Sequence, residues 1–269
     1  MSVNEGANGQ RSVQVEAEVP GSPGEVWQAI ASGPGISSWF VPTEVEERVG
    51  GSVKANFGPG MESESKITEW APPRTFKAEG PGMSPESPPM ATQWFVEAKS
   101  GDTCVVRVVH SWFASTDEWD GQFEAVEHGW NAFFKILRLK LQHFRGQRGA
   151  AFDVVGMSSG SESDAWAALT GPFELTDAAE GQEARSSGET PTLLGKVAVP
   201  ASAKDGERHL MLLASEPGAG VCHFFAMPMG EQVYVSIRFF LFGDGAADAV
   251  ASVEPEWKRW FGERFPMGW

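Results

Sequence analysis

The longest periodic pattern in the chain is a stripe of apolar residues within positions 119–144. Its members follow one another at steps of three and four, the spacing that places side chains on one face of an α-helix. They are Trp119, Phe123, Val126, Trp130, Phe133, Leu137, Leu141 and Phe144. Two Trp and three Phe on one face predict a large apolar partner, because each ring stabilises the fold by roughly 1.5–3 kcal/mol when it is fully buried.

The segments before this helix should supply that partner. Alternating apolar and polar residues at 13–19 predict a half-buried strand. A helix should follow, since Ser22 can serve as its N-cap, Pro23 suits its first position and Glu25 completes a capping box. A second helical turn is expected over 36–40. Short turns then separate six strand-like runs, which predicts an antiparallel meander at 42–48, 52–57, 62–70, 75–80, 90–98 and 103–113.

The second half of the chain repeats this plan in a reduced form. The segment DAWAAL at 164–169 corresponds to EVWQAI at 25–30, and a repeat of this size indicates a duplicated domain. A terminal helix is expected over 246–265, with a kink or a late start at Pro255. A polar loop is expected over 176–191. The predicted strands of this half are 151–157, 192–199, 208–215, 220–227 and 232–242.

Composition and charge exclude several classes of function. The formal net charge of −15 argues against a nucleic-acid partner, because proteins that bind phosphate backbones concentrate Lys and Arg. We find no secretory signal and no run of about 18 apolar residues that could cross a membrane. We therefore expect a cytoplasmic protein with no membrane partner.

Cys104 and Cys222 lie far apart in strand-like runs, which predicts buried thiols and neither a disulfide nor a metal pair.

Short motifs in the first half occur in an order that resembles a known family. They are VWQAI at 26–30, SWF at 38–40, GGSV at 50–53, ITEWAPPRTF at 67–76, TCVVRVVHSWF at 103–113 and HGW at 128–130. Together they resemble the family named after the activator of Hsp90 ATPase, within the START-like or Bet v 1-like (SRPBCC) superfamily. The resemblance covers residues 13–145. Residues 150–269 share only DAWAAL, the late strands and the terminal helix, and lack the Trp-Phe pair and the Gly-Gly turn.

The resemblance implies an α+β protein made of tandem helix-grip domains, each a curved antiparallel sheet wrapped around a long C-terminal helix. We expect a complete domain at 13–145 and a divergent one at 150–269. Relatives often hold an apolar molecule between sheet and helix, so the predicted function is binding of a small hydrophobic or amphipathic ligand, without a cofactor or a metal. The expected ligand-binding residues are Trp130, Phe133, Phe134, Leu137, Phe57, Trp70, Trp94, Trp112 and His110, with the loop at 81–89.

Two other functions stay open at this point. One is a co-chaperone or regulatory protein-interaction module, because the name-giving relatives act on a chaperone. The other is a cyclase- or aromatase-like enzyme, which would need an inward acid–base pair such as His110 with Arg107 or a nearby Glu. No strong catalytic motif is present, and we predict no catalytic residue. Glu124 and His128, one helical turn apart, could hold a metal or orient a base, but a solvated pair is the explanation that we favour.

Overall fold

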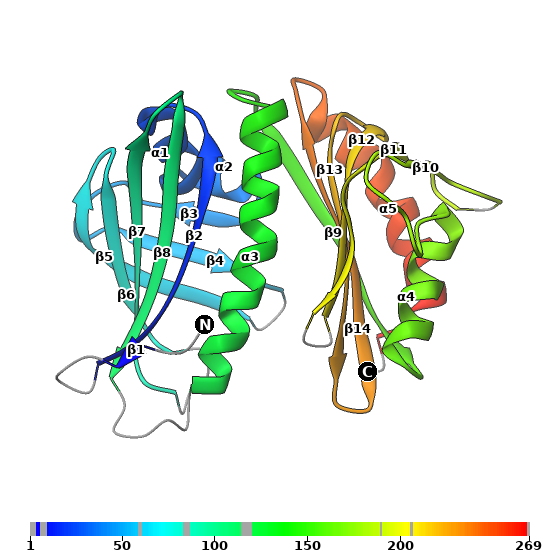
Figure 1. Cartoon of the computed structure of the whole chain (residues 1–269), viewed down its shortest axis with the longest axis horizontal. Coiled ribbons are helices and arrows are strands. Elements are labelled where there is room, and N and C mark those ends of the chain that lie inside the picture. The colour runs from blue at the N-terminus through cyan, green and yellow to red at the C-terminus, as the bar shows by residue number, and fades with distance from the viewer. Residues whose placement is uncertain are drawn as a thin grey trace. The chain divides into compact units, whose positions relative to one another are not determined.

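The computed structural model divides into two compact units, Met1–Gly146 and Gln147–Trp269 (Figure 1). It describes residues 4–5, 10–58, 61–82, 87–113, 120–188, 190–204 and 207–267, and within these ranges the side chains of residues 5, 120–128, 203–204 and 207 are not described. Each unit combines one antiparallel sheet with helices, which confirms the predicted α+β class and the tandem helix-grip architecture.

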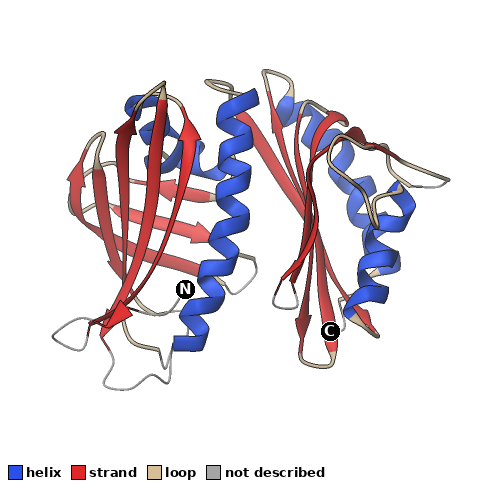
Figure 2. Cartoon of the chain, viewed as in Figure 1, coloured by secondary structure: helices blue, strands red, loops and turns tan. Residues whose placement is uncertain are grey.

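The first unit contains one sheet, two short helices and one long helix. In chain order its elements are β1 (Asn4–Glu5), β2 (Gln10–Pro20), α1 (Pro23–Ala31), α2 (Gly33–Ser37), β3 (Thr43–Val45), β4 (Ser52–Asn56), β5 (Glu62–Ala71), β6 (Thr75–Gly80), β7 (Met90–Lys99), β8 (Thr103–Phe113) and α3 (Asp120–His143). The sheet order is β1-β2-β8-β7-β6-β5-β4-β3. Strand β2 thus pairs with the last strand of the meander, and α3 packs against β2 (Figure 2).

The helix α3 carries the predicted stripe. Trp130, Leu137, Leu141 and Phe144 are all buried, and so is Phe134 beside them. Trp119 lies outside the described residues, as do the side chains of positions 120–128. Phe133, the remaining described member of the stripe, is only half-buried. Most of the described stripe is therefore buried in the first unit, as its composition predicts.

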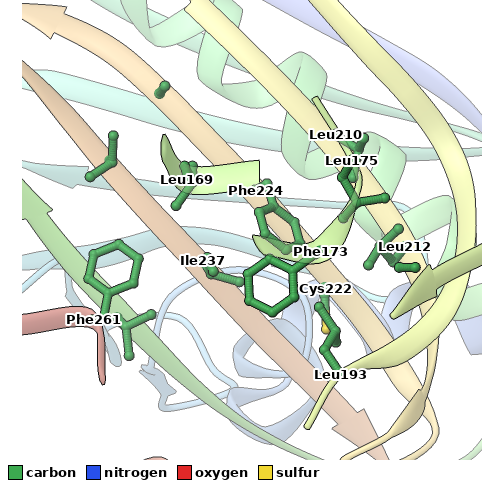
Figure 3. Packing of buried hydrophobic residues seen from close by; sticks show 14 of the residues in the cluster. Leu169, Phe173, Leu175, Leu193, Leu210, Leu212, Cys222, Phe224, Ile237 and Phe261 are labelled. Carbon is green, nitrogen blue, oxygen red and sulfur yellow. The ribbon is translucent and has the colours of Figure 1, made fainter. Parts of the chain in front are cut away.

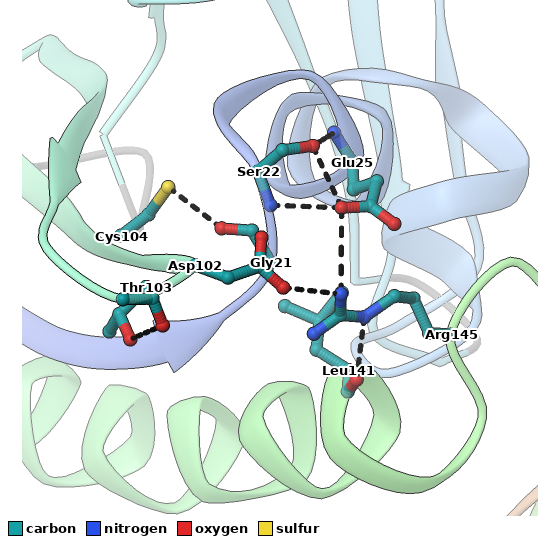
Figure 4. Close-up of polar contacts among 9 residues, drawn as sticks. Gly21, Ser22, Glu25, Asp102, Thr103, Cys104, Leu141 and Arg145 are labelled. Carbon is teal, nitrogen blue, oxygen red and sulfur yellow. Dashed lines mark hydrogen bonds and ion pairs between the residues drawn. The ribbon is translucent and has the colours of Figure 1, made fainter.

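The start of α1 follows the predicted capping box. The Ser22 N–H donates to Glu25 Oε2 at 2.9 Å, and the Glu25 N–H donates to Ser22 Oγ at 3.5 Å. Arg145, just beyond α3, donates to Asp102 Oδ2 at 2.8 Å and lies 3.8 Å from Glu25 Oε2 (Figure 4). The end of α3 is therefore tied both to the β7–β8 turn and to the start of α1. The predicted turn at 36–40 is wrong in its bounds, since α2 ends at Ser37 and Trp39 follows it.

A buried lysine near the end of α3 gives a first testable prediction. Lys140 is 6% exposed, and its Nζ donates to the Gly35 carbonyl at 3.3 Å. Burial lowers its pKa from 10.5 to about 8. Lys140→Met should therefore raise the free energy of unfolding at neutral pH by up to about 3 kcal/mol, because the unfolded chain holds this proton more tightly than the folded chain does. The Gly35 carbonyl keeps the Ser38 hydroxyl as a donor in the variant.

The stability gained by Lys140→Met should decrease as the pH rises from 8 to 10.5. Above pH 8, Lys140 of the folded wild-type protein is mostly neutral, so the wild type no longer loses stability by burying a charge. Urea unfolding at several pH values measures both effects. Lys99→Met, at an exposed position paired with Glu18, is the control and should change stability little. Equal or lower stability of Lys140→Met at pH 7 would show that the ammonium group is well accommodated.

The second unit repeats the topology of the first unit with one strand fewer. Its sheet has six strands, whereas β2 to β8 are seven. Its elements are β9 (Gly149–Ser159), α4 (Glu162–Thr170), the 3-10 turn η1 (Gly171–Phe173), β10 (Glu183–Arg185), β11 (Leu194–Lys204), β12 (Glu207–Glu216), β13 (Gly220–Met229), β14 (Gln232–Phe242) and α5 (Ala246–Arg264). The sheet order is β10-β11-β12-β13-β14-β9. Again the first strand of the unit pairs with the last strand of the meander.

The core of the second unit is filled by side chains from α4, η1, α5 and one face of the sheet. Phe173 and Phe224 meet there at 5.7 Å between ring centroids (Figure 3). Phe173 also stacks on Trp257 at 5.8 Å. Cys222 is buried in this core and Cys104 in the first unit, both as free thiols. The predicted loop at 176–191 is wrong in one respect, because Glu183–Arg185 pairs with β11. Helix α5 starts at Ala246 and continues through Pro255, without the late start.

Candidate functional site

The candidate site lies on the face of the first sheet that the aromatic residues of α3 contact. Alternation along each strand assigns side chains to this inner face. The register aligns Val13, His110, Thr92, Ala78 and Ile67 as one row across five strands. Of these five, all but Thr92 are buried.

Next to this row, around Trp94 on β7, aromatic rings fill the space between the sheet and the helices. Trp94 meets Trp39 at 6.2 Å and Phe134 at 6.1 Å between centroids, both edge to face. Trp39 also stacks on Phe134 at 6.3 Å, and its Nε1 donates to the Ala29 carbonyl at 2.8 Å. Each of these ring side chains is at most 3% exposed. This part of the inner face is a packed core.

His110 is held by one hydrogen bond to each ring nitrogen. The indole Nε1 of Trp130 donates to His110 Nε2 at 2.6 Å, and Thr92 Oγ1 lies 2.9 Å from His110 Nδ1. An indole N–H can only donate, so Nε2 is the acceptor and Nδ1 carries the proton that reaches Thr92. Burial lowers the pKa of His110 to about 4, which keeps the ring neutral near pH 7. His110 is therefore a fixed hydrogen-bonding group, already engaged on both sides.

The buried His110 predicts a loss of stability in acid. The unfolded chain protonates this ring near pH 6.5 and the folded chain only near pH 4, so stability should fall by up to about 3 kcal/mol as the pH drops through that window. His110→Gln can keep both hydrogen bonds without titrating. In urea unfolding from pH 7 to pH 4, its stability should fall less than that of the wild type. Parallel pH profiles would contradict a buried neutral His110.

On the side of the His110 row that faces away from Trp94, the side chains of the inner face become smaller or more exposed. Trp112 on β8 is still fully buried there, but its neighbours along the row are Met90 on β7, Gly80 on β6 and Ser65 on β5, and each is partly exposed. A Cβ placed on Gly80 would lie 2.4 Å from Ser65 Oγ, so the two positions are direct neighbours. From β7 to β5, flexible and small side chains thus replace the rings at this end of the sheet.

A series of aromatic rings leads from the packed core to the surface. Phe40 stacks on Trp130 with centroids 4.8 Å apart and planes 16° from parallel. It also meets Phe133 edge to face at 4.6 Å and Phe57 at 5.7 Å. Phe57 is 49% exposed, whereas Trp130 is 7% exposed. The series joins residues of α3, the α2–β3 connection and the position after β4 into one apolar wall.

The structure brings most of the predicted ligand-binding residues together. Trp94, Trp130, Phe133, Phe134 and Phe57 belong to one network of ring contacts. Trp70 joins the same network through Phe76, which stacks on Trp94. Of the other predicted residues, His110 contacts Trp130, and Leu137 and Trp112 are fully buried. Sequence reasoning missed Trp39 and Phe40 as members of the site, although they stand as an aromatic pair directly after a helix.

Several other predicted features lie elsewhere or outside the described residues. Arg107 alternates with His110 along β8 and so lies on the opposite face, where it pairs with Glu97 and stacks over Phe95 at 4.8 Å. The side chains of Glu124 and His128 lie outside the described residues, as do positions 83–86 of the loop at 81–89. Within the described part, no group of three or more His, Cys, Asp or Glu could hold a metal ion, and no helix could span a membrane.

The described parts of the chain contain hollows away from α3. One, of about 630 Å³, lies over β3, β4 and β5 and is lined mostly by polar side chains, among them Glu44, Lys54 and Glu64. Another, of about 290 Å³, lies in the second unit. Neither is lined by a described residue of α3. The cavity expected between the sheet and α3 therefore stays a prediction.

The first unit matches a known family over nearly its whole length. The model of the family described as activator of Hsp90 ATPase homolog 1-like protein matches residues 20–142. Residues 20–142 belong to that family. The match covers this Hsp90-activator-like unit from the end of β2 to the last turn of α3. No curated protein matches the chain.

Solved structures resemble the chain at low identity. The di-domain ARO/CYC BexL from the BE-7585A biosynthetic pathway is 15% identical with a TM-score of 0.47, over 95% of this chain and 99% of BexL. DynU16, from the dynemicin biosynthetic locus, is 17% identical with a TM-score of 0.42, over 93% and 95% of the two chains. The Aha1 dimer from Colwellia psychrerythraea is 22% identical with a TM-score of 0.42, over 50% of this chain and 98% of that one.

Proposed function

We propose that the Hsp90-activator-like unit binds a small hydrophobic or amphipathic molecule on the inner face of its sheet, next to α3. The observation that carries this proposal is the increase in exposure of the inner-face residues along the strands. Fully buried rings give way to the partly exposed residues Ser65, Gly80 and Met90. The aromatic series from Trp130 to Phe57 forms the adjoining wall.

The chemistry of these walls suits an apolar ligand with few polar groups. Stacked and edge-on rings offer a large apolar surface, and each Å² of ligand buried there contributes roughly 25 cal/mol. Ser65 supplies a hydroxyl group that can donate or accept hydrogen bonds, and Thr92, which accepts from His110 Nδ1, can still donate its own hydroxyl proton. His110 is already bonded on both nitrogens and stays neutral, so it contributes shape and no charge. Ligand sites combine apolar walls with a few polar groups in this way.

Native mass spectrometry of the freshly purified protein tests the proposal. A retained mass of a few hundred daltons, released by organic solvent, is the expected result. The ligand should be recovered by extraction and should rebind to the stripped protein in a one-to-one ratio. An unliganded mass in every preparation, together with no binding of any apolar compound to the stripped protein, would refute the proposal.

A second candidate function is contact with a chaperone, and the family match at residues 20–142 favours it. Such a role needs a protein surface and no cavity. Stimulation of the ATPase activity of a purified Hsp90-type chaperone, measured with and without this protein, separates the two functions. A cytoplasmic location belongs to both proposals, and cell fractionation tests it.

An enzymatic role of the cyclase or aromatase kind has less support from the described residues. It requires an inward acid–base pair, and the proposed partners His110 and Arg107 lie on opposite faces of the sheet. His110 would also have to give up its bond to Trp130 or Thr92 before it could move a proton. Its low pKa makes it a weak base near pH 7.

A further inference from the structure

The second unit contains a small cavity with one cationic and one anionic side chain in its walls. Its volume is about 290 Å³, close to the lower limit of small-molecule sites. It is lined by Thr176, Asp177, Ala178, Ala201, Ser202 and Arg208. It is separate from the inner face of the first unit, since all of these lining residues belong to the second unit.

One wall of the cavity is the segment after η1, which is fixed to α4. The indole Nε1 of Trp166 donates to the Thr176 carbonyl at 3.1 Å, and the hydroxyl groups of Thr170 and Thr176 are 3.1 Å apart. Trp166 and Thr170 are fully buried, so they hold this segment in place. Ala178, two residues further on, is buried and presents an apolar surface to the cavity. The wall is therefore formed before any ligand arrives, which reduces the entropy cost of binding.

The opposite wall comes from β11 and β12. Arg208 lies two residues before Leu210 on β12, so strand alternation places both side chains on the face that carries the core of the unit. The Arg208 side chain is 27% exposed, and its Nε donates to Glu162 Oε1 at 2.5 Å. That bond uses one of the five N–H donors of the guanidinium group, and the two Nη groups match the geometry of a carboxylate. Ala201, on β11, packs against the same core.

We propose that this cavity binds a small zwitterion of amino-acid size. The carboxylate of the ligand would pair with the Nη groups of Arg208, and its ammonium group would pair with Asp177. Ala178 and Ala201 would contact an apolar side chain. Because Glu162 and Asp177 together outnumber Arg208 in charge, a plain carboxylate would meet an unfavourable field, whereas a ligand with both charges would not.

Three probes of nearly equal size separate these contacts in titration calorimetry of the full chain. They are leucine, isocaproate, which lacks the amino group, and isoamylamine, which lacks the carboxylate. Leucine should bind at least about tenfold more tightly than either, because each of the others leaves one charged partner without its counterpart. No heat from leucine, or equal affinity for leucine and isocaproate, would overturn the proposal.

The variant Asp177→Asn assigns the ammonium contact. Asp177 is exposed at its position in the wall, so its replacement should not disturb the fold, whereas replacing Arg208 would also strand Glu162. Asp177→Asn should weaken leucine binding about tenfold and leave the weak binding of isocaproate unchanged or slightly improved. Asp248→Asn, in the first turn of α5, is the matched control and should bind leucine as the wild type does. Unchanged leucine affinity in Asp177→Asn would overturn the assignment of the site.

Discussion

Ser65→Trp is expected to weaken the binding of a hydrophobic probe, such as anilinonaphthalene sulfonate, to the first unit by at least about tenfold. Ser65 lies on the inner face of β5, beside Gly80 and partly exposed. An indole placed there would occupy the space that the ligand is proposed to fill, and the lost apolar contact area corresponds to more than about 1.4 kcal/mol. Fluorescence titration of the stripped protein measures the change.

The neighbouring position provides a matched control for this variant. Lys66 lies on the same strand, and its side chain alternates to the exposed outer face. Lys66→Trp adds the same indole outside the proposed site, so its probe affinity should equal that of the wild type. If the two variants bind the probe equally, the inner face beside Ser65 is not where the probe binds.

The largest effect on stability is expected for Trp39→Ala. The side chain of Trp39 is fully buried, packs against Trp94, Trp130 and Phe134, and donates to the Ala29 carbonyl. Truncation would leave a cavity at the centre of this network and remove the indole donor from a carbonyl near the end of α1. A loss of about 3–5 kcal/mol in the free energy of unfolding is the usual result for a buried Trp.

Urea unfolding monitored by circular dichroism measures this loss, and the transition of the first unit should move while that of the second stays in place. Trp39→Phe is the matched variant, because it keeps part of the ring contacts while it loses the hydrogen bond and the volume of the second ring, so its cost should be smaller than that of Trp39→Ala. A small effect of Trp39→Ala would mean that the surrounding rings close over the space, and that the network is less tightly packed than its contacts indicate.

The fold of the first unit was predictable because its signals are local and repeated. The stripe on α3 has a helical period, the cap at Ser22 needs three residues, and strands of the meander such as β8 alternate between buried and half-buried positions. The element missed in the second unit, β10, has the sequence EAR and no pattern of its own. Its place is decided by pairing with β11, a contact that no local pattern encodes.

The candidate site was predictable only in part. Sequence reasoning identified Trp94, His110 and Trp130 as candidates, but it did not reveal that Trp130 bonds His110 or that Phe40 joins Trp130 to Phe57. These contacts connect elements far apart in the chain. The change at the end of the inner face was missed because Ser65 and Gly80 carry no hydrophobic signal. Their importance comes from their small size at neighbouring positions, which only the register of β5, β6 and β7 shows.

Photolabelling gives the decisive test of an apolar site on the inner face of the first unit. A hydrophobic probe carrying a diazirine would be bound to the stripped protein, cross-linked by light and located by peptide mass spectrometry. We predict label on the inner residues of β5 to β7, at Ser65, Met90 and Thr92, and on α3 near Phe133, with loss of label when unlabelled ligand competes. Label confined to the second unit, or to the outer face of the first sheet, would contradict an inner-face site.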